Sequence, residues 1–144
     1  MVGLTSYTQA SVTILTTELN ALANNAYTAA SAEQDNSTNH DLLADFELSV
    51  TFGTNPTVNS TMDLYIVIAM DGTVYGDGGG AVAPAPTYWR GCFPLRAVTT
   101  IQHIALEGVP LPPEKWKAII LNNTTGQALG ATGHTLEFRS YKVG

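Results

Sequence analysis

The chain has 144 residues, of which 44% are hydrophobic and only 12% are charged, and its net charge is −6. This is enough apolar material for the core of one domain, but the polar surface must come mainly from Thr, Asn, Ser and Gly. The six basic residues are scattered, which argues against nucleic acid or an anionic membrane as a partner, because phosphate binding needs clustered Lys and Arg.

The N-terminal arm, residues 1–30, contains the one predicted helix, over residues 11–26. Its apolar residues recur at the spacing of one helical face, and Thr16 or Thr17 can cap its start. The residues on that face are Leu15, Leu19, Leu22 and Ala26. The polar segment 31–41 that follows is rich in turn-forming residues and is expected to be an exposed loop.

The rest of the chain predicts strands. Residues 43–52 alternate between apolar and polar side chains, which is typical of a half-buried antiparallel strand. Residues 61–70 are apolar on both faces from Leu64 to Met70 and predict a central strand that is covered on both sides. In the last strand Tyr141 falls on the face opposite Leu136 and Phe138. The further expected strands cover residues 92–100, 102–109, 115–123 and 134–143.

No predicted strand is followed by a helix in βαβ fashion. The connections are rich in Gly, Pro and Asn, and the chain offers about six to eight strands. We therefore expect one all-β domain over residues 1–144, an antiparallel β-sandwich or jelly roll with one short N-terminal helix.

Residues 71–91 form a long loop rich in glycine and proline, and such loops are usually functional or disordered. Its GDGGG run lacks the Lys-Ser/Thr of a phosphate-binding loop and no helix follows it. The loop ends in Tyr88, Trp89 and Arg90, the residue types enriched at interface anchors. We predict a partner interface at these three residues. Sugar stacking, and burial of the loop aromatics in the core, are the alternatives, and for Trp116 burial is expected.

Catalytic, cofactor and metal sites are not indicated. Asp71 and Asp77 flank a glycine-rich turn, but Ca²⁺ needs six to eight oxygen ligands and the sequence pattern of a calcium loop is missing. The histidines match no zinc spacing, and Cys92, the single cysteine, has no local nucleophile context and cannot form an internal disulfide. We therefore expect a protein that is not an enzyme and needs no cofactor. The three histidines are His40, His103 and His134.

Several segments together resemble structural proteins of tailed-bacteriophage virions. They are TTELNALANNA, the NSTN loop, DLYIVIAMDGTVYGDGG, and PLPPEKWKAIILNNTTGQAL followed by GATGHTLEFRSY, and residues 110–141 are the most specific part. The resemblance spans nearly the whole chain and implies a β-sandwich protein on the phage particle. It transfers no binding residue.

The expected function is therefore that of a capsid decoration or cement protein, which binds and stabilises the capsid lattice. Its expected partners are the major capsid protein and copies of itself, as a dimer or trimer, with no nucleic acid and no membrane. Its expected location is the virion, assembled in the bacterial cytoplasm. The alternatives are a tail-tube, head-completion or tail-tip protein, or a carbohydrate-binding module for host attachment.

Overall fold

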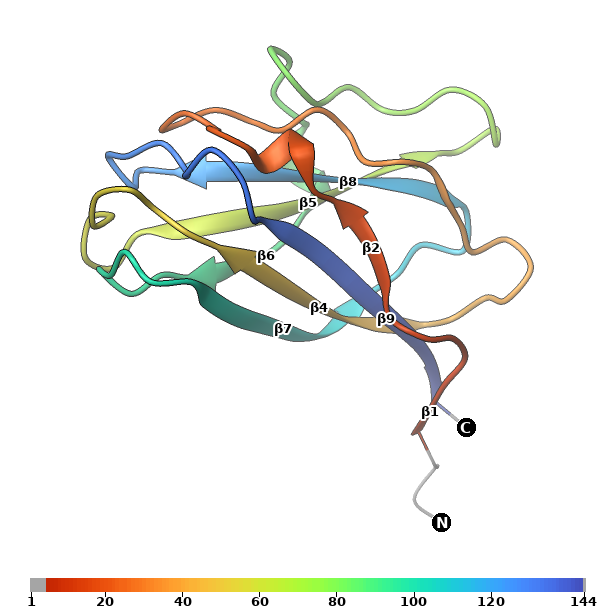
Figure 1. The fold of residues 1–144 in the computed structure, drawn as a ribbon. Helices are drawn as coiled ribbons and strands as arrows, with labels where there is room; N and C mark the ends of the chain where they lie inside the picture. Colours follow the sequence, from red (N-terminus) through yellow and green to blue (C-terminus); the bar gives the residue numbers. More distant parts are fainter. Residues whose placement is uncertain (1–4, 144) are drawn as a thin grey trace.

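The structure is a computed structural model that describes residues 5–143, and it contains two antiparallel sheets that lie in two layers (Figure 1). The all-β class and the antiparallel pairing expected from the sequence are confirmed. Residues 1–4 of the predicted N-terminal arm lie outside the described part of the chain.

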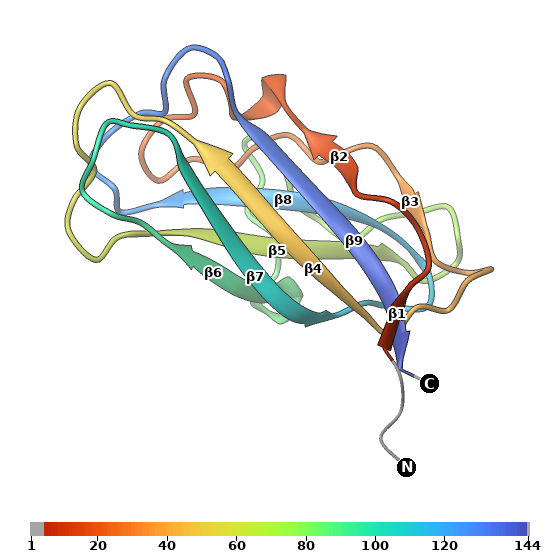
Figure 2. The ribbon, with the colours of Figure 1, turned by 60° about the horizontal axis from the view of Figure 1, so that its bottom comes forward.

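The first sheet has the order β1-β9-β4-β7, and β2 pairs with β9 beside β1 (Figure 2). Strand β4 lies between β9 and β7, and its side chains alternate as the sequence predicts. Phe46, Leu48 and Val50 are buried, whereas Asp45 and Glu47 face outward. The strands are β1 (Thr5–Tyr7), β2 (Val12–Leu15), β4 (Leu43–Val50), β7 (Gln102–Pro110) and β9 (Thr135–Val143).

The second sheet has the order β3-β8-β5-β6, and its long strand β5 is central, as expected. Both faces of β5 are covered, because Leu64 and Ile66 face the core while Val67 on the other face is also buried. The strands are β3 (Gln34–Asp35), β5 (Thr61–Ala69), β6 (Trp89–Pro94) and β8 (Lys115–Asn123).

The core between the sheets centres on three aromatic rings. The Trp116 ring of the second sheet packs edge-on against Phe138 of the first, with ring centroids 5.0 Å apart. Phe46 stacks on Phe138 at 5.7 Å and meets Trp116 at 6.1 Å. The expected burial of Trp116 is confirmed, since its side chain is 1% exposed.

The predicted N-terminal helix is absent, and this prediction was wrong. Residues 12–15 form β2, and only a single 3₁₀ turn, η1 (Thr17–Leu19), follows. Ala21 and Asn25 have positive φ angles of 53° and 61°, which no α-helix accommodates. Strand β2 instead pairs with β9, so it forms hydrogen bonds with the backbone groups of β9 that a helix in its place would leave without partners.

Two further expectations need correction. The segment 31–41 is not simply an exposed loop, because Gln34 and Asp35 form β3, and Asn36 and Asp41 are buried. The strand expected at 92–100 runs instead from Trp89 to Pro94, because these are the residues that pair with β5; residues 95–101 lead across to β7 in the other sheet.

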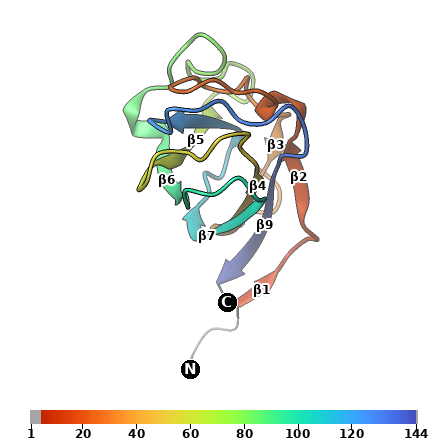
Figure 3. The ribbon, with the colours of Figure 1, turned by 60° about the vertical axis from the view of Figure 1, so that its left-hand side comes forward.

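The long loop is held against the protein rather than projecting from it. In Figure 3 it lies over the second sheet, on the side away from the first. The backbone N–H of Gly80 donates to Thr28 O at 2.8 Å, and the N–H of Gly76 donates to Ile68 O at 3.1 Å. The loop contains a second 3₁₀ turn, η2 (Pro86–Tyr88), and leads into β6. This packing closes the outer face of the second sheet and accounts for the burial of Ile119 beneath Gly78.

Replacing Gly79 by alanine is expected to cost roughly 2 kcal/mol of unfolding free energy, because Gly79 has φ +101° and an added Cβ would lie 2.9 Å from the Ala30 backbone nitrogen. The matched control is Gly80→Ala, at φ +62° with open space around the Cβ, which should cost only about 1 kcal/mol. Urea unfolding of both variants measures the difference. Equal losses would mean that the loop does not rest on residue 30.

Candidate functional site

The outer face of the first sheet is not covered by the long loop, and it gathers acidic side chains. Four of the chain's twelve Asp and Glu residues lie there. Glu47 of β4 and Glu137 of β9 are direct cross-strand partners, an arrangement of like charges that destabilises a sheet. Arg139 adds a basic side chain to this face, where it is the cross-strand partner of Asp45. Because such repulsion lowers stability, its presence on this face makes the face a candidate for binding a partner. The four acidic residues are Asp45, Glu47, Glu107 and Glu137.

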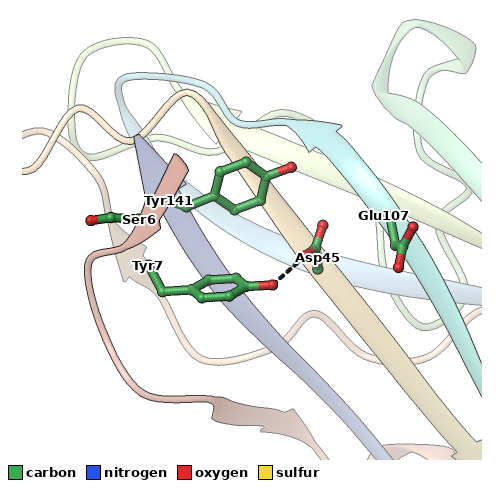
Figure 4. A pocket seen from close by; sticks show the side chains of 5 residues that line it. All are labelled: Ser6, Tyr7, Asp45, Glu107 and Tyr141. Atoms are coloured by element: carbon green, nitrogen blue, oxygen red, sulfur yellow. Dashed lines mark hydrogen bonds between the residues drawn. The ribbon is translucent and has the colours of Figure 1, made fainter. Parts of the chain in front are cut away.

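One end of this face is hollowed into a cleft of about 360 Å³ (Figure 4). The cleft is built from β1, β4, β7 and β9, so strand register alone brings its residues together. Beside it lies a second hollow of about 230 Å³ that reaches Glu47 and Glu137. The lining residues of the cleft are Ser6, Tyr7, Asp45, Glu107 and Tyr141.

Asp45 is fixed at the centre of the cleft. Its Oδ2 accepts a hydrogen bond from Tyr7 Oη at 2.8 Å, and its Oδ1 accepts one from the Gly108 N–H at 2.9 Å. The Tyr7 ring meets Tyr141 edge-on at 5.6 Å, and the Arg139 guanidinium lies 3.9 Å from the Tyr7 ring centroid. The result is a wall of aromatic edges and carboxylate oxygens.

The electrostatics of the cleft keep both phenols protonated. The hydrogen bond to the Asp45 carboxylate, and then its charge, raise the pKa of Tyr7 above its usual value. Partial burial, followed by the charge of Asp45, raises the pKa of Tyr141. The cleft therefore offers phenol donors, carboxylate acceptors and ring surface, a set that suits ammonium, guanidinium or sugar hydroxyl groups.

The predicted interface residues lie elsewhere, at the edge strand of the second sheet. Trp89 is 48% exposed, so it does not plug the core. Tyr88 is half-buried against Gly76, and Arg90 Nη1 donates to the carbonyl oxygens of Thr87 and Trp89. The structure thus leaves Trp89 available for contact but does not join it to the cleft, and the interface at Tyr88, Trp89 and Arg90 stays a prediction.

One Ser-His-Glu grouping on the open face does not form a catalytic relay. Ser49 Oγ lies 2.8 Å from His103 Nδ1, but Glu47 Oε1 approaches the same nitrogen, at 3.8 Å. A triad needs the nucleophile and the acid on different ring nitrogens. This arrangement gives no support for hydrolytic chemistry.

Two of the remaining sequence candidates, Asp71 and Cys92, have ordinary structural surroundings. Asp71 accepts hydrogen bonds from the backbone N–H groups of Thr73 and Val74, as turn chemistry predicts. Burial and the charge of Asp63 raise the pKa of the Cys92 thiol, which lowers its thiolate fraction and reactivity. Within residues 5–143, no three His, Cys, Asp or Glu side chains converge to hold a metal ion.

A polar cluster at the base of the long loop predicts a pH dependence. Tyr75 Oη donates to Glu33 Oε2 at 2.6 Å, Lys115 Nζ lies 3.2 Å from Glu33 Oε1, and Lys117 Nζ lies 4.4 Å from the Tyr75 ring centroid. The Tyr75 hydrogen bond, then Lys115, lowers the pKa of Glu33, while burial and the Glu33 hydrogen bond raise the pKa of Tyr75.

Because the folded pKa of Glu33 is depressed, its stabilising contribution is present above its unfolded pKa and is lost as pH falls through the folded value. The raised pKa of Tyr75 has the opposite sign, so its contribution is lost in strong alkali. We expect the amide hydrogens of Gly76 and Gly80 to lose exchange protection on acidification in the wild type. In Glu33→Gln this acid-dependent loss should be smaller, and an unchanged pH profile would contradict the assignment.

No family model matches this chain, and no curated protein matches its sequence. None of the helical segments within residues 5–143 is long and apolar enough to cross a membrane.

The sequence would not have identified the cleft, because its residues come from four strands. The one available signal was the alternation of side chains along the last strand, which places Tyr141 on the outer face of β9.

Proposed function

We propose that this chain is a structural protein of a tailed-bacteriophage virion, a decoration or cement protein that binds and stabilises the capsid lattice. The proposal further assigns the chain to the jelly-roll type of sandwich. The observation that carries it is the nested order of strand pairing, and the open acidic face supplies the contact surface.

The strand pairs are nested from the outside of the sequence inward. When β1 and β2 are counted as parts of one strand, the first strand pairs with the last, β9. In turn β3 pairs with β8, β4 with β7 and β5 with β6. A chain doubled back on itself in this way and rolled into two sheets is a jelly roll, a fold frequent in viral capsid and lectin domains. This is a fold-level analogy, so the surface must carry the functional argument.

The two outer faces of the sandwich differ in a way that supports a contact role. The long loop already covers the second sheet, whereas the first sheet keeps its acidic face and cleft open. The charged fraction of only 12% leaves most of the remaining surface able to be buried without desolvating ions. We propose that the open face contacts a Lys- or Arg-bearing surface of the major capsid protein, with copies of this chain related by the lattice symmetry.

The test is the location of the protein on its particle. Cryo-electron microscopy of the parent virion should show this chain on the outer lattice with the first sheet facing the capsid. Shells stripped of the protein should rebind wild type, and Glu107→Gln with Tyr141→Ala should weaken rebinding at least about tenfold. Asp77→Asn, an exposed acidic residue on the long loop, is the matched control and should rebind normally. Absence of the chain from purified virions would refute the proposal.

A carbohydrate-binding role in host attachment is the second candidate, and the tyrosine–carboxylate cleft is the observation that favours it. A glycan array that compares wild type with Tyr141→Ala and Trp89→Ala separates the two surfaces. Binding lost only in Tyr141→Ala would assign sugar to the cleft, and binding lost only in Trp89→Ala would assign it to the predicted interface at the end of the loop. Stable hexameric rings of purified protein would instead favour a tail-tube role.

A further inference from the structure

Strand β7 forms an open edge of the first sheet (Figure 2). In the described part of the chain it pairs with β4 alone, and apart from that ladder no hydrogen bond engages the backbone of residues 103–107. The other sheet edges are short or irregular, because β1, β2 and β3 have three, four and two residues and the pairing of β6 shifts register at Tyr65. Unpaired groups along an edge are a template for a strand from another chain.

The available edge of β7 ends at a β-bulge. Ala44 pairs with Val109 and Phe46 pairs with Leu106, so two residues of β7, Glu107 and Gly108, lie opposite the single residue between them on β4. Gly108 has a φ of +67°, and a bulge of this kind bends the strand and increases its twist. The edge that an added strand can follow is therefore residues 103–107, whose midpoint is Ala105.

The side chains along this edge differ between its two faces. On the outer face, His103, Ala105 and Glu107 are exposed. On the inner face, Ile104 and Leu106 pack against the core but are only partly buried, because the first sheet ends at β7. An added strand must therefore cover two apolar side chains on the inner face and match an imidazole and a carboxylate on the outer face.

A second copy of β7 meets both conditions in one register. Antiparallel partners point to the same face, so a twofold axis can pass through Ile104, Ala105 or Leu106. With the axis at Ala105, His103 faces Glu107 of the partner subunit and Ile104 faces Leu106 of the partner subunit, and the symmetry repeats both pairs. An axis at Ile104 would instead place His103 against Ala105 of the partner subunit. An axis at Leu106 would place Ala105 against Glu107 of the partner subunit and draw in the bulge.

His103 and Glu107 can form such a pair. His103 Nδ1 lies 2.8 Å from Ser49 Oγ, and Glu47 Oε1 is farther from the same nitrogen, at 3.8 Å. When the Ser49 hydroxyl donates to Nδ1, the ring proton is on Nε2, which can then donate to a carboxylate. Glu107 is exposed and takes part in neither of the ion pairs found within residues 5–143. A donor and an acceptor are thus available at the two ends of the edge.

We propose that β7 pairs with β7 of a second copy of this chain, antiparallel across a twofold axis at Ala105, so that the first sheets of the two copies form one continuous sheet. Both acidic outer faces then lie on the same side. The inference does not rest on the proposed virion role, because dimerisation is measured on the purified chain and the virion role on the particle. An interface along one short edge is small, so the dimer should be weak, with a Kd of roughly 10–100 μM.

Sedimentation equilibrium over a concentration series tests the contact. The wild type should show a reversible monomer–dimer equilibrium. His103→Glu places two Glu–Glu pairs across the axis and should weaken dimerisation at least about tenfold. Adding Glu107→Lys restores opposite charges in the Ala105 register alone, and the double variant should return to within about threefold of the wild-type Kd. The matched control is Ala83→Glu, which adds the same charge at an exposed position of the long loop and should dimerise normally.

Cross-linking tests the position of the axis in variants that carry Cys92→Ser, which removes the single native thiol. Residue 105 of one copy directly faces residue 105 of the other, so Ala105→Cys should give a covalent dimer on mild oxidation or with a short bismaleimide. Ala83→Cys, also exposed, should remain largely monomeric. A wild type that is monomeric up to about 1 mM, stable trimers or larger rings, or equal cross-linking of the two cysteine variants would overturn the proposal. A dimer that His103→Glu leaves intact would overturn it as well.

Discussion

Replacing Trp116 by alanine is expected to lower the free energy of unfolding by about 3–5 kcal/mol, the range typical of a buried aromatic residue truncated to alanine. The indole is 1% exposed and comes from β8 of the second sheet. Its neighbours Phe46 and Phe138 come from the first sheet. The substitution therefore removes the ring that joins the two layers, and the edge-to-face contacts are lost together with the buried area.

Urea unfolding followed by circular dichroism measures this loss, and Trp89→Ala is the matched control. Trp89 is 48% exposed, so its truncation should cost about 1 kcal/mol, well below the loss expected for Trp116→Ala. If Trp116→Ala does not fold, Trp116→Phe should fold with a smaller loss. Similar losses for Trp116→Ala and Trp89→Ala would contradict the role of Trp116 at the centre of the core.

The strands were the most predictable part of the fold, because a strand that is buried on one face alternates apolar and polar residues along the sequence. β4 alternates from Leu43 to Leu48, and β8 covers residues 115–123, the range expected from the sequence. The long apolar run of β5 also identified a strand covered on both sides. Which segment covers its outer face was not predictable, since that depends on glycines at positions such as Gly79 that let the loop approach residue 30.

The helix predicted for the N-terminal segment was wrong because the spacing of its leucines fits a helix as well as a short strand followed by a turn. Leu15, Leu19 and Leu22 recur at helical spacing, and all three are indeed buried. Their burial is achieved by a short strand and a turn, because β9 offers β2 an open edge. Local periodicity cannot reveal a partner strand from the other end of the chain, and tertiary pairing overrides the weak helical preference of a Thr-rich segment.

The candidate site was the least predictable feature, since cross-strand register creates it. Tyr7, Asp45, Glu107 and Tyr141 are isolated polar or aromatic residues in the sequence, with no spacing that joins them. The sequence instead drew attention to Tyr88, Trp89 and Arg90, which are adjacent and have the composition of an anchor. Only the parity of Tyr141 indicated an outward side chain on the first sheet.

Asn122→Asp is expected to cost about 3–5 kcal/mol at neutral pH, because the Asn122 side chain ties β8 to the N-terminal segment at Leu22 and to the turn at residues 125–127. The side chain is fully buried, and its Nδ2 donates to Leu22 O at 3.0 Å and to Gln127 O at 2.9 Å. Its Oδ1 accepts a hydrogen bond from Thr125 Oγ1 at 2.6 Å. An aspartate keeps the acceptor but loses both donors, so a carboxylate oxygen faces two carbonyl oxygens.

The pH dependence gives this prediction a definite sign. A buried aspartate at position 122 has a folded pKa above its unfolded value of about 3.9, so the folded state holds its proton to higher pH. Stability of the variant relative to wild type therefore falls as pH rises between these two values, and the loss shrinks toward pH 4, because a protonated carboxyl can donate one hydrogen bond.

Urea unfolding of wild type and variant at several pH values measures the difference. Asn24→Asp is the matched control, because Asn24 is exposed and uses only its Oδ1, which accepts the Gly126 N–H at 2.9 Å. Aspartate preserves that acceptor, so this control should remain within about 0.5 kcal/mol of wild type. A loss in Asn122→Asp that is independent of pH would mean that the carboxylate reaches solvent, and the buried hydrogen-bond network around residue 122 would then have to be rejected.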